Sequence, residues 1–136
     1  MTSHGHIHPD LTRNQTLVYG ALTGADAPLS AYTILDHLRD NGFRAPLQVY
    51  RALDKLVEFG MVHRLESLNA FVACRHPECD TCETIAFAIC ERCGKVAEVA
   101  DEKLARQLRA LAKEAGFAPR KSMVELRGTC HACQPI

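Results

Sequence analysis

The stretch PLQVYRALDKLVEFGMVHRLESLNAFVAC, residues 46–74, changes its hydrophobic period halfway along. Its first half begins with a proline and carries apolar residues such as Val49 and Leu53 at helical spacing, until Gly60 stops the helix. Its second half holds two β-prone runs around a turn at residues 66–69. The stretch therefore predicts a helix followed by a two-stranded ribbon.

Two further helices are predicted upstream of this stretch. Thr12 is a suitable N-cap for a helix over residues 12–24, and Ser30 caps a second helix that Gly42 stops. Three short helices followed by a two-stranded ribbon is the order of elements in a winged-helix domain.

The C-terminal part of the chain has a different pattern. A strand pair is expected around residues 90–93, then an amphipathic helix over 101–116, then a strand that leads into residues 130–133. We therefore expect an α+β protein with an N-terminal winged helix and a C-terminal α/β domain. The predicted divisions are a disordered tail (1–10), the winged helix (11–74), a polar hinge (75–84) and the C-terminal domain (85–136).

Length and composition restrict the classes of protein to which this chain can belong. It has 136 residues, 47% of them hydrophobic, which suffices for one ordinary domain or two small ones. No stretch has the ~18 apolar residues of a membrane helix and the N-terminus has no apolar signal core, so we expect a cytoplasmic protein. The formal net charge is zero. Bulk charge therefore does not indicate a nucleic-acid binder, and that function must come from a local pattern.

Seven cysteines in a chain expected in the reducing cytosol indicate metal binding rather than disulfides. Two segments, CERC and CHAC, have the CxxC spacing, and two such turns complete a tetrahedral shell of four sulfurs. A redox-active CxxC opens a helix after a strand, whereas CERCG leads into the β-prone KVAEVA. We predict a structural zinc ion whose ligands are Cys90, Cys93, Cys130 and Cys133.

Three segments resemble a known family: QVYRALDKLVEFGMVHRLES (48–67), FAICERCGKVAEV (87–99) and LRGTCHAC (126–133). Together they resemble the ferric uptake regulator superfamily of bacterial metal-dependent repressors. The details SLNAFVAC and ICERCG are most similar to its zinc uptake regulator branch. The resemblance runs from about Leu11 to Cys133. It implies that the winged helix (11–74) is a DNA-binding domain and that the C-terminal α/β domain (85–136) is a dimerisation domain. It further implies a homodimer that binds an A·T-rich palindromic operator when loaded with metal.

The resemblance also implies that the third helix enters the major groove of DNA, with Tyr50 and Arg51 facing it. Gln48 stands where the family usually has a threonine. Helical spacing puts Gln48, Arg51 and Lys55 away from the apolar stripe, where an arginine can bind phosphate or guanine. The alternative interpretation of Arg51 is an ordinary surface charge. We predict that Gln48, Tyr50, Arg51 and Lys55 form the DNA-binding face.

A second zinc site, which would sense the metal, is implied by the same resemblance. The zinc uptake regulator branch uses a histidine after the third helix, a cysteine at the end of the wing, a histidine in the linker and a glutamate after the first CxxC. His63, Cys74 and Glu98 match three of these positions. The linker histidine has no match. The fourth ligand, which the linker would supply, stays open among four residues, of which the first two are ranked highest: Cys82, Glu83, Cys79 and His76.

Nitrogen, oxygen and sulfur donors together suit Zn²⁺ better than Mn²⁺ or Fe²⁺. One ion held by His63, Cys74 and Glu98 would tie the two domains together and shift the population toward the DNA-competent form. We therefore predict a zinc-responsive repressor, not an enzyme, with two zinc ions per protomer and zinc as co-repressor. The alternatives are an iron, manganese or peroxide sensor of the same superfamily, a redox switch through Cys74, Cys79 and Cys82, and a zinc enzyme.

Overall fold

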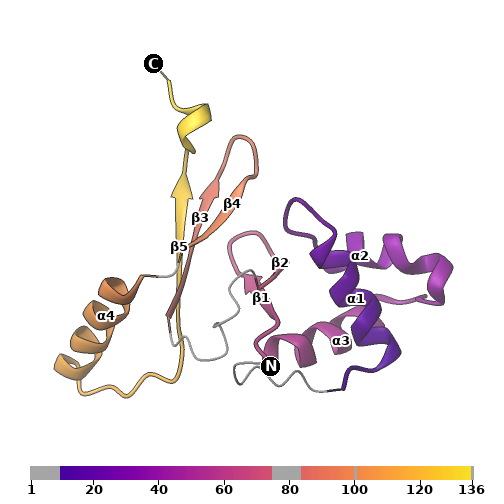
Figure 1. Cartoon of the computed structure of the whole chain (residues 1–136), viewed down its shortest axis with the longest axis horizontal. Coiled ribbons are helices and arrows are strands. Elements are labelled where there is room, and N and C mark those ends of the chain that lie inside the picture. Colours follow the sequence, from indigo (N-terminus) through magenta and orange to yellow (C-terminus); the bar gives the residue numbers. More distant parts are fainter. Residues whose placement is uncertain (1–9, 75–83, 100, 136) are drawn as a thin grey trace, which may run out of the picture. The chain divides into compact units, whose positions relative to one another are not determined.

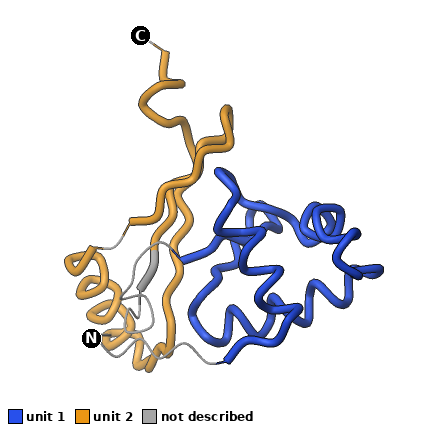
Figure 2. Tube along the Cα trace, turned by 45° about the vertical axis from the view of Figure 1, so that its right-hand side comes forward, with its two compact units in different colours: residues 1–80 blue, residues 81–136 orange. Residues whose placement is uncertain are grey.

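The computed structural model describes residues 10–74, 84–99 and 101–135. The chain separates into two compact units, residues 1–80 and 81–136, which Figure 2 shows in different colours. The division lies inside the segment interpreted from the sequence as a hinge. The N-terminal tail and most of that hinge lie outside the described residues.

The three helices of the first unit begin at the places that the sequence predicts. Thr12 and Gln15 form a capping box, in which Thr12 Oγ1 accepts from the Gln15 N–H at 3.2 Å and the Thr12 N–H donates to Gln15 Oε1 at 3.0 Å. Ser30 Oγ accepts from the Thr33 N–H at 3.1 Å. The helices are α1 (Arg13–Thr23), α2 (Ala31–Leu38), the short 3₁₀ turn η1 (Arg39–Asn41) and α3 (Pro46–Glu58) (Figure 1).

A two-stranded ribbon follows α3 directly. Strands β1 (Val62–Leu65) and β2 (Ala70–Ala73) pair antiparallel. The turn between them ends at Asn69, whose φ of +48° lies in the left-handed region that asparagine tolerates. Leu29 joins the ribbon through a bridge to Phe71, with N–H···O distances of 3.0 and 2.8 Å. Three helices and this ribbon form the predicted winged helix.

One hydrophobic core of fifteen buried residues holds the first unit together. Its largest fully buried side chains come from α1, α2, α3, β1 and the loop before α3, among them Leu22, Ile34, Phe43, Leu53 and Val62. Because a core of this size buries enough apolar surface for a small domain, the winged helix can present its outer helix face on a rigid support.

The second unit is a small sheet with one helix. The strand order is β4-β3-β5, with β3 and β4 antiparallel and β3 and β5 parallel, so the α+β class is confirmed. The elements are β3 (Thr84–Cys90), β4 (Val96–Val99), α4 (Glu102–Glu114), β5 (Ser122–Gly128) and the 3₁₀ turn η3 (His131–Cys133).

Few apolar side chains are buried in the second unit. Those described are Ala86, Phe87, Ile89, Cys90 and Ala105. Only Phe87 and Ile89 among them are large, so apolar burial alone gives this unit little stability. None of the described helices combines the length and the apolar character that crossing a membrane requires.

Candidate metal centre and DNA-facing helix

The parallel pairing of β3 with β5 brings the two CxxC segments together. The register runs to Cys90 opposite Gly128, and Cys130 follows two residues later. Because parallel strands end at the same edge of a sheet, the segments that follow them leave the sheet side by side. The four cysteine sulfurs consequently all lie within 4.8 Å of one another, as predicted for one metal site.

Each CxxC segment forms a tight turn. After β3, the Cys93 N–H donates to Cys90 Sγ at 3.4 Å, and the Gly94 N–H donates to the Cys90 carbonyl at 3.0 Å. Gly94 has a φ of +78°, a conformation that glycine adopts without a Cβ penalty. After β5, the Cys133 N–H donates to the Cys130 carbonyl at 3.0 Å. The two turns meet where Cys93 Sγ lies 3.8 Å from Cys130 Sγ.

Hydrogen bonding within the cluster moves the pKa values of Cys90 and Cys133 in opposite directions. Hydrogen bonds from the backbone of Cys130 and of Cys93 lower the pKa of Cys90 from 9.0 to about 6, against the opposing effect of burial. Hydrogen bonding with the Cys130 and Cys90 sulfurs raises the pKa of Cys133 to about 12. Like charges at this spacing cannot all ionise unaided, so four thiolates here require a cation.

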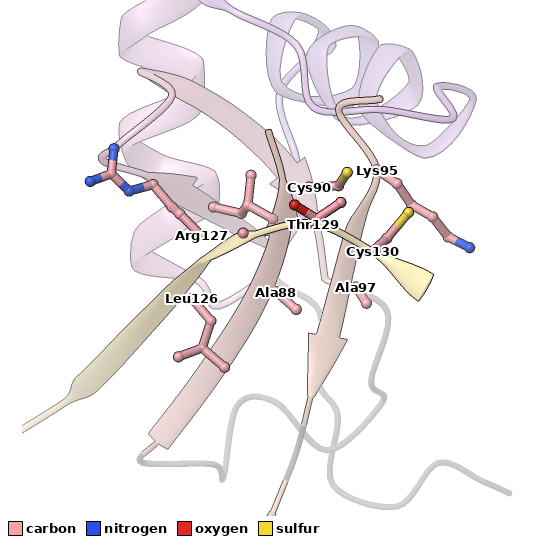
Figure 3. A pocket seen from close by; sticks show the side chains of 10 residues that line it. Ala88, Cys90, Lys95, Ala97, Leu126, Arg127, Thr129 and Cys130 are labelled. Carbon is pink, nitrogen blue, oxygen red and sulfur yellow. The ribbon is translucent and has the colours of Figure 1, made fainter. Parts of the chain in front are cut away.

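The donor set fits a structural zinc ion. Four thiolates complete the tetrahedral shell of Zn²⁺ and leave no open position for a substrate or an activated water. A cavity of about 320 Å³ adjoins the sulfurs of Cys90 and Cys130 (Figure 3). Its other lining residues include the small or apolar Ala88 and Leu126 together with Lys95.

His63 and Cys74, predicted to sense the metal, lie in the first unit, His63 in strand β1 and Cys74 directly after strand β2. His63 pairs with Val72 in the β1–β2 register, and the Cys74 N–H donates to the Met61 carbonyl at 2.9 Å, just beyond the ribbon. Their ligand atoms lie within 4.8 Å of each other. Only 1% of the His63 surface is exposed, so its side chain lies within the unit and not on its surface.

Two further groups of residues were predicted to take part in sensing the metal. Glu98 lies on β4 in the second unit, opposite Phe87 of β3. The four candidates for the linker ligand lie outside the described residues: His76, Cys79, Cys82 and Glu83. The sensing site and the redox alternative through the linker cysteines therefore stay predictions.

The outer surface of α3 carries the residues predicted to bind DNA. Arg51 and Lys55 are exposed, and Lys55 Nζ lies 3.2 Å from Glu58 Oε2. Tyr50 is half-buried and packs against the core. Gln48 is also half-buried, and its amide oxygen accepts hydrogen bonds from the backbone. The two cations are thus presented outward, whereas Tyr50 and Gln48 are partly engaged within the unit.

Two exposed residues of the first unit were not found from the sequence. Tyr32, at the start of α2, is 61% exposed, and Leu47, at the start of α3, is 57% exposed. The available signal was their helical position, since each lies outside the apolar stripe of its helix. Leu47 lies four residues before Arg51 and therefore on the same face of α3.

A winged helix followed by an α/β unit with a four-cysteine metal centre is the build of one family of regulators. The chain belongs to the ferric uptake regulator family, whose model matches residues 12–127. It is 41% identical to the zinc uptake regulation protein of Escherichia coli (strain K12) over 127 residues, which cover 93% of this chain and 74% of that protein.

Solved structures agree with this assignment. A zinc uptake regulator complexed with zinc and DNA has a TM-score of 0.84 and 40% identity, covering 91% of this chain and 83% of that chain. The crystal structure of holo XcZur has a TM-score of 0.81 and 42% identity, covering 90% and 85% of the two chains. The expected family and its zinc uptake regulator branch are therefore confirmed.

Proposed function

We propose that this protein is a cytoplasmic, zinc-responsive transcriptional repressor that binds operator DNA as a homodimer with zinc as co-repressor. The observation that carries the proposal is its 40% identity and 0.84 TM-score to a zinc uptake regulator complexed with zinc and DNA. The closed four-sulfur centre supports a regulator rather than an enzyme, because it leaves no coordination position for a substrate.

Operator binding is assigned to the exposed face of α3. Arg51 can hydrogen-bond guanine bidentately or bind phosphate, and Lys55 adds a second cation one turn later. Because the formal net charge is zero, non-specific attraction to DNA is weak. The affinity for operator DNA must therefore come from a small contact surface that is present in two copies.

A homodimer would provide the second copy of this contact surface. The second unit exposes several large apolar side chains, among them Val99 (42%), Leu111 (62%), Phe117 (68%) and Leu126 (60%). Monomeric proteins rarely leave such a set in water, so a second copy of the chain is the expected cover. Two α3 helices in one dimer then bind two half-sites together, and their affinities combine.

The two zinc ions of each protomer have different roles, one structural and one regulatory. The four cysteines of the second unit hold a permanent ion that maintains the fold. We assign the regulatory ion to His63, Cys74 and Glu98, with a fourth ligand from the linker. Imidazole, thiolate and carboxylate together favour Zn²⁺, and the thiolate of Cys74 disfavours the manganese and iron alternatives. Its ligands belong to both units, so binding links their arrangement to the free zinc concentration.

The proposal is tested by titrating the dimer with Zn²⁺, Mn²⁺ or Fe²⁺ at buffered free concentrations and measuring its binding to duplex DNA selected from a random pool. Thiolate ligation predicts activation by Zn²⁺ at sub-nanomolar to nanomolar free concentrations. Activation by Mn²⁺ or Fe²⁺, without activation by Zn²⁺ in that range, would show that the protein senses another metal.

A further inference from the structure

The first turn of α3 is held by a side chain that the sequence places on its DNA-facing side. Gln48 Oε1 accepts the backbone N–H of Arg44 at 2.6 Å and the backbone N–H of Ala45 at 3.0 Å. Ala45 is the N-cap residue and has no side-chain acceptor, and Pro46 follows it without an N–H. Gln48 therefore supplies the N3 half of a capping box, in which the side chain at N3 accepts the backbone N–H of the N-cap residue.

This capping restricts what Gln48 can do at a base edge. A glutamine that recognises adenine bidentately must accept from the adenine N6 amino group through Oε1 while Nε2 donates to N7. Both lone pairs of Gln48 Oε1 are already used by two backbone donors. Recognition of adenine would require breaking two hydrogen bonds and fraying the helix that carries Arg51.

Leu47, the neighbouring residue, is presented to the outside instead. It is 57% exposed, whereas Val49, two positions later, is fully buried in the core. Leu47 and Arg51 are four residues apart, which places them one above the other on the same face of α3. An apolar side chain beside an exposed arginine has one matching group in the major groove, which is the C5-methyl group of thymine.

We propose that Leu47 is the specificity-determining side chain of the first turn of α3, contacting a thymine methyl group, while Gln48 is a positioning residue that caps the helix and reads no base. The inference rests on the proposed operator binding. It also explains why an apolar residue stands in water on the face that carries the cations: in the complex it is covered by the floor of the major groove.

The test uses the zinc-loaded full-length protein and a duplex that this protein selects from a random-sequence pool. Each thymine of the selected duplex is replaced in turn by deoxyuridine, which lacks only the C5-methyl group. We expect one thymine per half-site at which this replacement weakens binding of the wild-type protein about fourfold, the factor that corresponds to one buried methyl group. The Leu47→Ala variant should bind both duplexes equally at that position, and Leu47→Met should retain the discrimination.

Variants of Gln48 separate capping from base recognition. Gln48→Ala should lower the melting temperature, weaken binding to all duplexes by a similar factor and reduce discrimination only at the thymine assigned to Leu47. Gln48→Glu keeps an acceptor for both N–H groups, so it should restore the melting temperature.

Three results would overturn the inference. The first is a thymine discrimination that persists in Leu47→Ala. The second is a Gln48→Ala protein that melts normally but changes its preferred base at another position. The third is a wild-type protein that selects no sequence at all, which would also overturn the proposed function, whereas the first two leave that function intact.

Discussion

The four-cysteine centre should carry most of the stability of the second unit, and replacing one ligand tests this directly. We expect Cys93→Ser to unfold the second unit while the first unit remains folded. Cys93 is the most exposed of the four cysteines, so its replacement disturbs packing least and isolates the loss of a metal ligand. Its sulfur lies 3.8 Å from that of Cys130, at the point where the two turns meet.

Zinc binding should contribute more to the free energy of unfolding of the second unit than the burial of its apolar side chains does. The two large buried side chains of the second unit, Phe87 and Ile89, contribute about 1.5–3 kcal/mol each, or roughly 3–6 kcal/mol together. A structural zinc ion bound to a small domain contributes about 10–16 kcal/mol at neutral pH. A small domain retains only about 5–15 kcal/mol of net stability, so losing most of the zinc contribution exceeds its margin.

The chain provides separate probes for its two units. It has three tyrosines and no tryptophan, and Tyr19, Tyr32 and Tyr50 all lie in the first unit, so tyrosine fluorescence reports the unfolding of that unit alone. Hydrogen exchange of the paired β3 and β5 backbone reports the second unit. In Cys93→Ser, or in the wild-type protein with a strong zinc chelator, we expect loss of protection in both strands and an unchanged tyrosine transition.

The matched control is Cys74→Ser, which also replaces a cysteine by a serine but leaves the four-sulfur centre intact. Protection in β3 and β5 should persist in this variant. If Cys93→Ser retained the protection of both strands, the second unit would not depend on zinc, and the comparison of magnitudes above would be wrong.

Further results are expected for the metal sites, for α3 and for the core of the first unit. Cys74→Ser should abolish zinc-dependent DNA binding, measured by fluorescence anisotropy, yet leave the dimer intact by light scattering; dissociation of the dimer would contradict the division into two metal sites. Arg51→Ala should weaken operator binding at its own base position or uniformly, according to whether it contacts guanine or phosphate, whereas Lys55→Ala should lower the slope of log affinity against log salt by about 1; an unchanged slope would remove Lys55 from the interface. Because the pKa of Cys133 is raised to about 12, that thiol is protonated at neutral pH, and zinc must displace its proton to bind. The affinity of the four-cysteine site for zinc, measured by competition with a chelator, should therefore rise with pH, and a pH-independent affinity would refute the assignment of thiolate ligands. Leu53→Ala, at a fully buried position, should destabilise the first unit by about 2–5 kcal/mol in urea unfolding followed by tyrosine fluorescence, and a smaller loss would mean that the core relaxes around the cavity.

Local chemistry made the helices and the ribbon predictable. Thr12 and Ser30 cap α1 and α2 as expected, because a capping side chain bonds to an N–H only two or three residues away. Gly60 ends the turn after α3 with a φ of +78°, a conformation that glycine favours. These signals need no knowledge of the rest of the fold.

The role of Gln48 was not predictable in the same way. Helical spacing placed it beside Arg51 on the exposed side, and that position alone suggested contact with a base. In the structure, the Gln48 amide oxygen accepts the backbone N–H groups of Arg44 and Ala45, and Leu47 is the exposed side chain of this turn. Position on a helix determines the face of a residue, but the direction of a flexible side chain depends on which donors the surrounding backbone leaves unsatisfied.

The fold class and the four cysteines of the metal centre could be predicted from the amino-acid sequence, because CxxC spacing is a local property of the chain. The meeting of the two pairs, in contrast, is a property of the folded unit. That meeting depends on the parallel register between β3 and β5, which joins Cys90 to Gly128 across a long connection that contains β4 and α4. The same structure decided which side chains face outward, since exposure is set by the packing of the whole unit and not by spacing within one helix.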